Sequence, residues 1–227
     1  MTANPMEGLP QPLILGSGSF TRKMILKEMG IDFHLLVRPI DERTIGDRVN
    51  DTPQDLVLTL AKAKCEHLVN EIKSGRAEKE LPHASSHAGW IVLSGDQVVT
   101  HNGDILEKPL DVDEARSFVS RYACSPPKTV GAVVLTHVPS GIQVSGVDSA
   151  TIVFRPSVVD ADLVNQLLED GAPVLSCAGG LMVEHPLVRE HVERIDGTED
   201  SVMGLSKDLV LQLLQEMRVK LKEANLQ

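Results

Sequence analysis

The chain has 227 residues, of which 42% are hydrophobic and 24% charged, and its formal net charge at pH 7 is −10. This composition is typical of a globular protein, and a chain of this length can bury an adequate core as one large domain or two small ones. The acidic balance argues against a general grip on nucleic acid, which needs a basic patch or stripe. A few local cations would still suffice to hold a small anionic ligand.

Cysteine content and apolar runs bear on the compartment. Three cysteines, Cys65, Cys124 and Cys177, cannot all pair and include no CxxC spacing, which favours a reducing compartment and no structural zinc. No apolar run approaches the roughly 18 residues of a membrane span. The opening residues, MTANPMEGLPQP, lack the basic flank and apolar core of a signal peptide. We therefore expect a cytoplasmic protein without membrane contacts.

The first half of the chain alternates between predicted strands and helices. After an N-terminal extension at 1–12, we expect a strand at 13–15, a helix at 21–30, a strand at 33–37 and a helix at 52–72. The apolar run Leu13, Ile14 and Leu15 is typical of a buried strand. In the second helix, Thr52 can cap and Pro53 suits the first helical position.

The second half begins with a loop-like insert and then returns to regular elements. Residues 74–89, rich in small and polar side chains, predict an exposed excursion or a disordered insert. We expect further strands at 90–93, 98–99, 105–106, 129–137 and 143–154, and helices at 111–122, 160–168 and 206–221. Asn102-Gly103 predicts a hairpin turn. These elements predict one α/β domain at 13–227, with a mixed central sheet and flanking helices.

The junction LILGSGSFTRK at residues 13–23 could hold an anion. Where a strand ends and a helix begins, unpaired backbone N–H groups and the positive end of the helix dipole point into one small volume. Ser17 and Ser19 can add hydroxyl hydrogen bonds there, and Arg22 can bind phosphate oxygens through its fork of N–H groups. A glycine-rich turn with a serine helix cap explains the same residues, so both interpretations stay open.

Seven segments, taken together and in this order, resemble the Maf family of nucleoside triphosphate pyrophosphatases. The segments are SGSFTR at 17–22, DE at 41–42, LAKAK at 60–64, SGDQVV at 94–99, GDILEKP at 103–109, CAGG at 177–180 and GTEDSVMGL at 197–205. The resemblance runs from about Leu13 to about Leu214. It implies that the two lobes of a single domain surround a nucleotide cleft, as in inosine triphosphate pyrophosphatases.

The resemblance also implies site residues and a cofactor. It assigns phosphate binding to Ser17, Ser19 and Arg22, and catalysis to Asp96, Glu42, Lys64 and Lys108. Asp96 would be the proton acceptor. Glu42 and Asp96 would together hold a divalent cation, magnesium or manganese, because hard cations prefer carboxylate oxygens.

Substrate choice follows from three further positions. The pair Asp96-Gln97 and the segment CAGGLMVE are similar to the branch of the family that acts on 7-methylguanosine triphosphate, in which Thr21, Gln97 and Glu184 occupy specificity positions. A carboxylate such as Glu184 can accept hydrogen bonds from the N–H edge of guanine. The alternatives are the dTTP/UTP branch and a nucleotide-binding regulator of cell division with little turnover. The resemblance implies a small-molecule nucleotide substrate and a homodimer; we expect no nucleic acid polymer as a partner.

Overall fold

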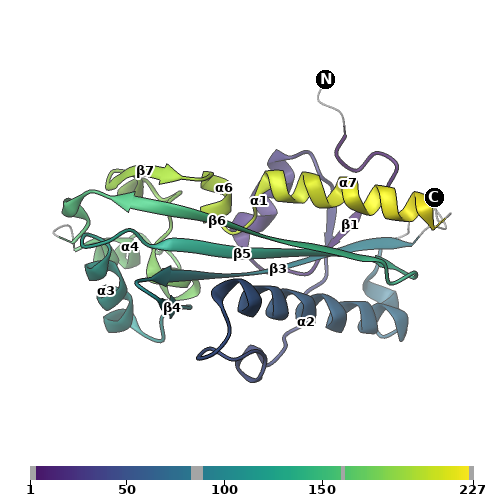
Figure 1. The fold of residues 1–227 in the computed structure, drawn as a ribbon, viewed down its shortest axis with the longest axis horizontal. Coiled ribbons are helices and arrows are strands. Elements are labelled where there is room, and N and C mark those ends of the chain that lie inside the picture. The colour runs from purple at the N-terminus through teal and green to yellow at the C-terminus, as the bar shows by residue number, and fades with distance from the viewer. Residues whose placement is uncertain (1–3, 83–88, 160–161, 225–227) are drawn as a thin grey trace. The chain divides into compact units, whose positions relative to one another are not determined.

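The computed structural model describes residues 4–82, 89–159 and 162–224 and has the mixed α/β fold expected from the sequence (Figure 1). Its strands are β1 (Leu13–Leu15), β2 (Phe33–Leu35), β3 (Trp90–His101), β4 (Asp104–Leu106), β5 (Lys128–Val138), β6 (Gln143–Phe154) and β7 (Val192–Asp196). Its helices are α1 (Phe20–Glu28), α2 (Pro53–Lys73), α3 (Val112–Arg121), α4 (Leu163–Glu169), α5 (Pro186–Arg189), α6 (Glu199–Val202) and α7 (Lys207–Glu223).

The seven strands form one mixed sheet. Their order is β2-β1-β3-β5-β6-β7, and β4 pairs with β3. The strand β1 is parallel to both β2 and β3, whereas β4 and β7 are antiparallel to their partners β3 and β6. Within the described residues, no helix is long and apolar enough to span a membrane.

The chain divides into two compact units that share three long strands. Unit 1 consists of Met1–Asp96, Ala132–Val147 and Leu205–Gln227, and unit 2 of Gln97–Gly131 and Asp148–Gly204. The strands β3, β5 and β6 therefore each contribute residues to both units.

Unit 1 packs helices against the strands β1 and β3. The long helix α2 begins as predicted, with the Thr52 side chain accepting from the backbone N–H of Asp55 and a proline at its first position. Its buried face consists of Leu56, Val57, Leu60, Ala61, Cys65, Leu68, Val69 and Ile72. The Ser94 hydroxyl of β3 donates to the carbonyl of Ala61 at 2.7 Å, which joins α2 to β3. Figure 1 draws α7 on the opposite side of these strands from α2.

Unit 2 is built around a second core. Its hairpin from β3 to β4 turns at Asn102 and Gly103, which both have positive φ, as the sequence predicts. Asp111 caps α3 by accepting from the N–H of Glu114 at 2.8 Å. The Tyr122 ring stacks on Phe154 in the core of this unit, and the Tyr122 hydroxyl donates to the carbonyl of Gly179 at 2.7 Å.

The structure differs from the sequence-based prediction in β3 and after residue 185. Residues 90–101 form one continuous strand, whereas the sequence predicts two short strands separated by 94–97. This position of the strand requires a glycine, because a Cβ atom at Gly95 would lie only 2.7 Å from the carbonyl oxygen of Ala132. Three short elements, α5, α6 and β7, are absent from the prediction.

Two predicted boundaries fall on residues outside the described ranges. The helix expected at 160–168 is described from Leu163 to Glu169, and residues 160–161 lie outside the described part of the chain. In the predicted insert, Glu78–Glu80 form a single 3-10 turn and residues 83–88 lie outside the described ranges.

Candidate active site

The loop from β1 to α1 carries two serines that are held by local hydrogen bonds. The Ser19 side chain caps α1 by accepting from the N–H of Arg22 at 3.4 Å, and it shares a hydrogen bond with the Thr21 hydroxyl at 2.9 Å. The Ser17 hydroxyl oxygen accepts from the N–H of Ser19 at 3.3 Å. This loop therefore orients two hydroxyl groups next to the N-terminal N–H groups of α1, which is an arrangement suited to an anion.

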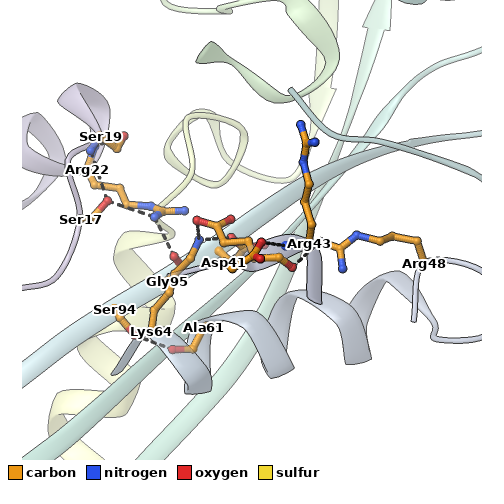
Figure 2. A network of polar contacts seen from close by, with 12 residues as sticks. Ser17, Ser19, Arg22, Asp41, Arg43, Arg48, Ala61, Lys64, Ser94 and Gly95 are labelled. Carbon is orange, nitrogen blue, oxygen red and sulfur yellow. Dashed lines mark hydrogen bonds and ion pairs between the residues drawn. The ribbon is translucent and has the colours of Figure 1, made fainter. Parts of the chain in front are cut away.

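Arg22 lies across this loop, and its guanidinium is fixed by two acceptors (Figure 2). Its Nη1 donates to the carbonyl of Gly95 at 2.8 Å and to the Ser17 hydroxyl at 3.2 Å. Burial lowers the pKa of Arg22, while the nearby carboxylates of Asp96 and Glu42 act in the opposite direction. The guanidinium of Arg22 and two of the predicted acidic residues therefore lie in one electrostatic neighbourhood of unit 1.

Lys64 joins those two acidic residues. Its ammonium lies 2.6 Å from Asp96 Oδ1 and 3.0 Å from Glu42 Oε1. The Asp96 side chain is 10% exposed and that of Lys64 is 17% exposed, whereas the Glu42 side chain is 42% exposed. Two carboxylates from distant parts of the sequence thus converge on one cation, and both were predicted as site residues.

The segment that carries Glu42 is shaped by a cap and an arginine. Asp41 accepts from the N–H of Arg43 and caps the 3-10 turn Glu42–Thr44. Arg48 donates to the carbonyl oxygens of Glu42 at 2.9 Å and Ile45 at 2.5 Å. Figure 2 shows Arg48 and Arg43 on the same side of the network, away from the Ser17 loop.

The donor set of unit 1 fits a cation that brings other ligands with it. Among the residues that the structure describes, no group of three or more His, Cys, Asp or Glu side chains could hold a metal ion. Magnesium commonly takes one or two carboxylates together with water and substrate phosphates. Glu42 and Asp96 match that kind of site, and they do not match an all-protein cage.

In unit 2, the charges of Lys108 and Glu184 both influence the pKa of one thiol, that of Cys177. The pKa of Cys177 is raised to about 11, mainly by burial and in smaller part by the Glu184 carboxylate, while the Lys108 ammonium acts in the opposite direction. Burial also raises the pKa of Glu184, while His185 and Arg189 lower it. Lys108 is exposed and Glu184 is half-buried. Lys108 and Glu184, two of the predicted residues of unit 2, therefore lie near the same thiol.

Gln97, the third predicted residue of unit 2, is used by a neighbouring helix. Its amide Nε2 donates to the carbonyl oxygens of Ser201 at 2.9 Å and Val202 at 3.1 Å, both in α6. Because Asp96 and Gln97 are consecutive in β3, their side chains point to opposite faces of the strand.

The sequence-based prediction missed several residues that shape these sites. Gly95 supplies the carbonyl that accepts from Arg22, and its signal in the sequence is a glycine inside a buried strand. Ser94 fixes α2 to β3, and Arg48 fixes the Glu42 segment. Asp148, whose carboxylate accepts from the Ser201 hydroxyl, carries no signal in the sequence.

Comparison with known proteins assigns a family. The model of the family described as Maf-like protein matches residues 12–217. A 7-methyl-GTP pyrophosphatase of Dictyostelium discoideum is 33% identical over 91% of this chain and 98% of its own length. A dTTP/UTP pyrophosphatase of Salinibacter ruber is 30% identical over 98% of both chains, and a nucleoside triphosphate pyrophosphatase of Salinispora tropica is 28% identical over 93% of this chain and 86% of its own. The family model covers both units, so the resemblance seen in the sequence is confirmed and the chain belongs to the Maf family.

Proposed function

We propose that this protein is a nucleoside triphosphate pyrophosphatase that hydrolyses the α–β phosphate linkage of 7-methyl-GTP, releasing pyrophosphate and the nucleoside monophosphate. The observation that carries the proposal is the Lys64 ammonium in contact with both the Asp96 and Glu42 carboxylates, close to Arg22. The names of the similar proteins support the same reaction class.

Asp96 is the residue that would activate water. Its Oδ1 is held by Lys64, which leaves Oδ2 to orient a water molecule and accept its proton. As the water oxygen bonds to the α-phosphorus, the bond between this phosphorus and the α–β bridging oxygen breaks. The electron pair of that bond leaves with pyrophosphate. A carboxylate fixed on a strand by an ion pair meets the geometric demand of this step, because the base must not swing away from the water.

The cations of the site would stabilise the phosphate charge. Ser17, Ser19 and the N-terminal N–H groups of α1 would bind phosphate oxygens, and Arg22 would add a charge that stays in place because Gly95 and Ser17 hold its guanidinium. Lys64 and Lys108 would offset the charge that grows on the oxygens as the bond breaks. Electrostatic stabilisation of this kind supplies most of the rate gain in phosphoryl transfer.

Glu42 and Asp96 would hold a divalent cation, magnesium or manganese, that arrives with the nucleotide. When bound, this cation supplies charge neutralisation to the triphosphate. The role of Glu42 is then to orient that ion through its carboxylate, and its half-exposed position allows the exchange from Lys64 to a metal ligand.

Recognition of the base would fall to Glu184, with Gln97 and Thr21 contributing to specificity. Burial raises the pKa of Glu184 because the ionised carboxylate loses contact with water. A ligand N–H that donates to this carboxylate would replace the lost hydrogen bond and stabilise the ionised form. The amino and ring N–H groups of a guanine provide such donors. A dTTP/UTP preference is the second candidate, favoured by the 30% identity to a dTTP/UTP pyrophosphatase over nearly the full length of both chains.

The test is to incubate the protein with Mn²⁺ and 7-methyl-GTP, UTP or dTTP and to measure pyrophosphate and monophosphate. We expect release of both products to be greatest with 7-methyl-GTP and to fall at least about 100-fold in Asp96→Asn. A matched control is Asp113→Asn, which changes an exposed carboxylate of α3. Tight nucleotide binding without turnover in the wild-type protein would contradict the proposal and support a regulator instead.

A further inference from the structure

The amide of Gln97 has only one orientation that its surroundings allow. Its Nε2 faces two carbonyl oxygens, those of Ser201 and Val202, at the end of α6. A flipped amide would set its Oε1 against the same two oxygens, and neither could donate. Both amide protons of Gln97 are therefore engaged with α6, which is a structural use of this side chain.

The helix α6 is also held by a chain of hydrogen bonds to β6. The Thr198 side chain accepts from the N–H of Ser201 at 3.3 Å and shares a hydrogen bond with the Ser201 hydroxyl at 2.7 Å. The Ser201 hydroxyl donates to Asp148 Oδ2, and Ser201 is only 7% exposed. Because the single Ser201 hydroxyl proton goes to the carboxylate, the Thr198 hydroxyl must donate to Ser201. Gln97 and Asp148 thus hold α6 from two different strands.

The helix α6 is also tied to the segment that carries Glu184. Glu199 of α6 forms an ion pair with Arg189, the last residue of α5, and Arg189 interacts electrostatically with Glu184. The helix α5 begins at Pro186, two residues after Glu184. Side chains at the end of α6, Val202 and Met203, pack against the same hydrophobic cluster as Val183 and Val188. A shift of α6 would therefore move both the charge and the packing around Glu184.

We propose that Gln97 is a positioning residue for nucleotide choice, acting with Asp148 and Ser201 through α6 and Arg189 to set the position of Glu184. The inference rests on the proposed function, because it takes Glu184 as the residue that contacts the base. This role differs from a direct contact between Gln97 and the nucleotide. It predicts that Asp148 and Ser201, which are not among the predicted site residues, influence nucleotide choice in the same way as Gln97. The segment 197–205 belongs to the resemblance but has no role assigned by it. In this proposal it connects Gln97 and Asp148 to Glu184 through α6.

The test compares variants at both supports of α6 by the ratio of kcat/KM for 7-methyl-GTP to that for UTP. We expect Gln97→Met, Ser201→Ala and Asp148→Ala to change this ratio in the same direction by at least about fivefold, the lower end of typical coupling between sites. Asp148→Asn keeps an acceptor for the Ser201 hydroxyl and should restore the wild-type ratio. Asp104→Asn, an exposed residue of unit 2 paired with Arg121, is the matched control.

Hydrogen exchange separates a loosened α6 from general unfolding. In the same three destabilising variants, the amides of Val202, Met203 and Gly204 should exchange faster, while amides of α7 keep their wild-type rates. A changed ratio in Gln97→Met, together with wild-type ratios in Ser201→Ala and Asp148→Ala, would overturn the proposal and assign Gln97 a direct contact.

A double-mutant cycle tests the final step to Glu184. If Gln97 acts through Glu184, the effects of Gln97→Met and Glu184→Gln on the ratio must be non-additive, and Arg189→Met should resemble Gln97→Met. Additive effects would overturn the link. If the wild-type protein releases no pyrophosphate, the proposed function fails separately, and the same comparison is made on the dissociation constants of the two nucleotides.

Discussion

The Lys64 ammonium lies 2.6 Å from the Asp96 carboxylate, in an ion pair that links α2 to β3 at a largely buried position. Ser94, two residues before Asp96, donates to the carbonyl of Ala61, three residues before Lys64. The ion pair and this hydrogen bond both join α2 to β3, so together they fix the position of the helix along the strand. The position of Asp96 thus depends on the packing of α2 as much as on β3.

Removal of Lys64 should destabilise the protein, because the buried Asp96 carboxylate would lose its ion-pair partner. Lys64→Met leaves Asp96 Oδ1 without its ion pair, and we expect the free energy of unfolding to fall by about 2 kcal/mol, less than for a fully buried pair. Urea denaturation measures this change. The double variant Lys64→Met/Asp96→Asn removes the charge as well and should recover at least about half of the loss. A double variant with a loss equal to the sum of both single losses would contradict this account.

The two acceptors of Arg22 make a lysine a poor substitute. Arg22 donates to Gly95 and Ser17 through Nη1, and these two contacts fix the plane of its guanidinium; the ammonium of Arg22→Lys has no such plane, so its charge should be placed less precisely for a phosphate group. The loss of a charge-assisted hydrogen bond predicts a decrease in kcat/KM of about 10- to 100-fold. Pyrophosphate release at several nucleotide concentrations measures it. Arg43→Lys, an exposed arginine near the same network, is the control and should change kcat/KM less than about twofold.

Gly95 should not tolerate even one methyl group. In Gly95→Ala the new Cβ would lie 2.7 Å from the carbonyl oxygen of Ala132 and 3.6 Å from Arg22 Cζ. We expect a loss of about 1–3 kcal/mol in stability from the forced movement of β5. Gly18→Ala is the matched control, because its Cβ would meet nothing within 4 Å. Equal melting temperatures for the two variants would refute the steric argument.

Local signals explain which elements the sequence predicts well. The cap at Thr52, the cap at Asp111 and the Asn102-Gly103 turn are each encoded within four residues, and all three are confirmed. By contrast, β3 continues through Gly95 as a neighbour of β5 in the sheet, and the close approach there involves Ala132, 37 positions later. Such a contact depends on tertiary packing, which no local window contains.

The candidate site shows the same division. The Ser17 and Ser19 loop is readable from a short stretch, since its hydrogen bonds join residues two to five positions apart. The bond between Ser201 and Asp148 spans 53 positions, and the bonds from Gln97 to α6 span more than 100. A single sequence names Gln97 only through family resemblance, and it offers nothing that connects Gln97 to Asp148.

The stability of the protein should depend on pH through Glu184. Burial raises the folded-state pKa of Glu184 above its ordinary value of 4.5, so the neutral group is favoured by folding. Its contribution to stability is complete below pH 4.5 and is lost as the pH rises through the folded pKa. Glu184→Gln should therefore gain stability relative to wild type between acidic and neutral pH. Unfolding free energies measured from pH 4 to pH 8 test this, with the exposed Glu193→Gln as control.

Cys177 provides a chemical probe of the arrangement in unit 2. Its pKa of about 11 implies that its alkylation by iodoacetamide is slow at pH 8 and accelerates about tenfold for each pH unit up to that value. The exposed Cys124 should react first. Glu184→Gln removes a nearby negative charge and should speed the reaction of Cys177, whereas Lys108→Met removes a positive charge and should slow it. Opposite changes in these two variants require both charges to lie near the same sulfur, and equal rates in both would show that at least one of them does not.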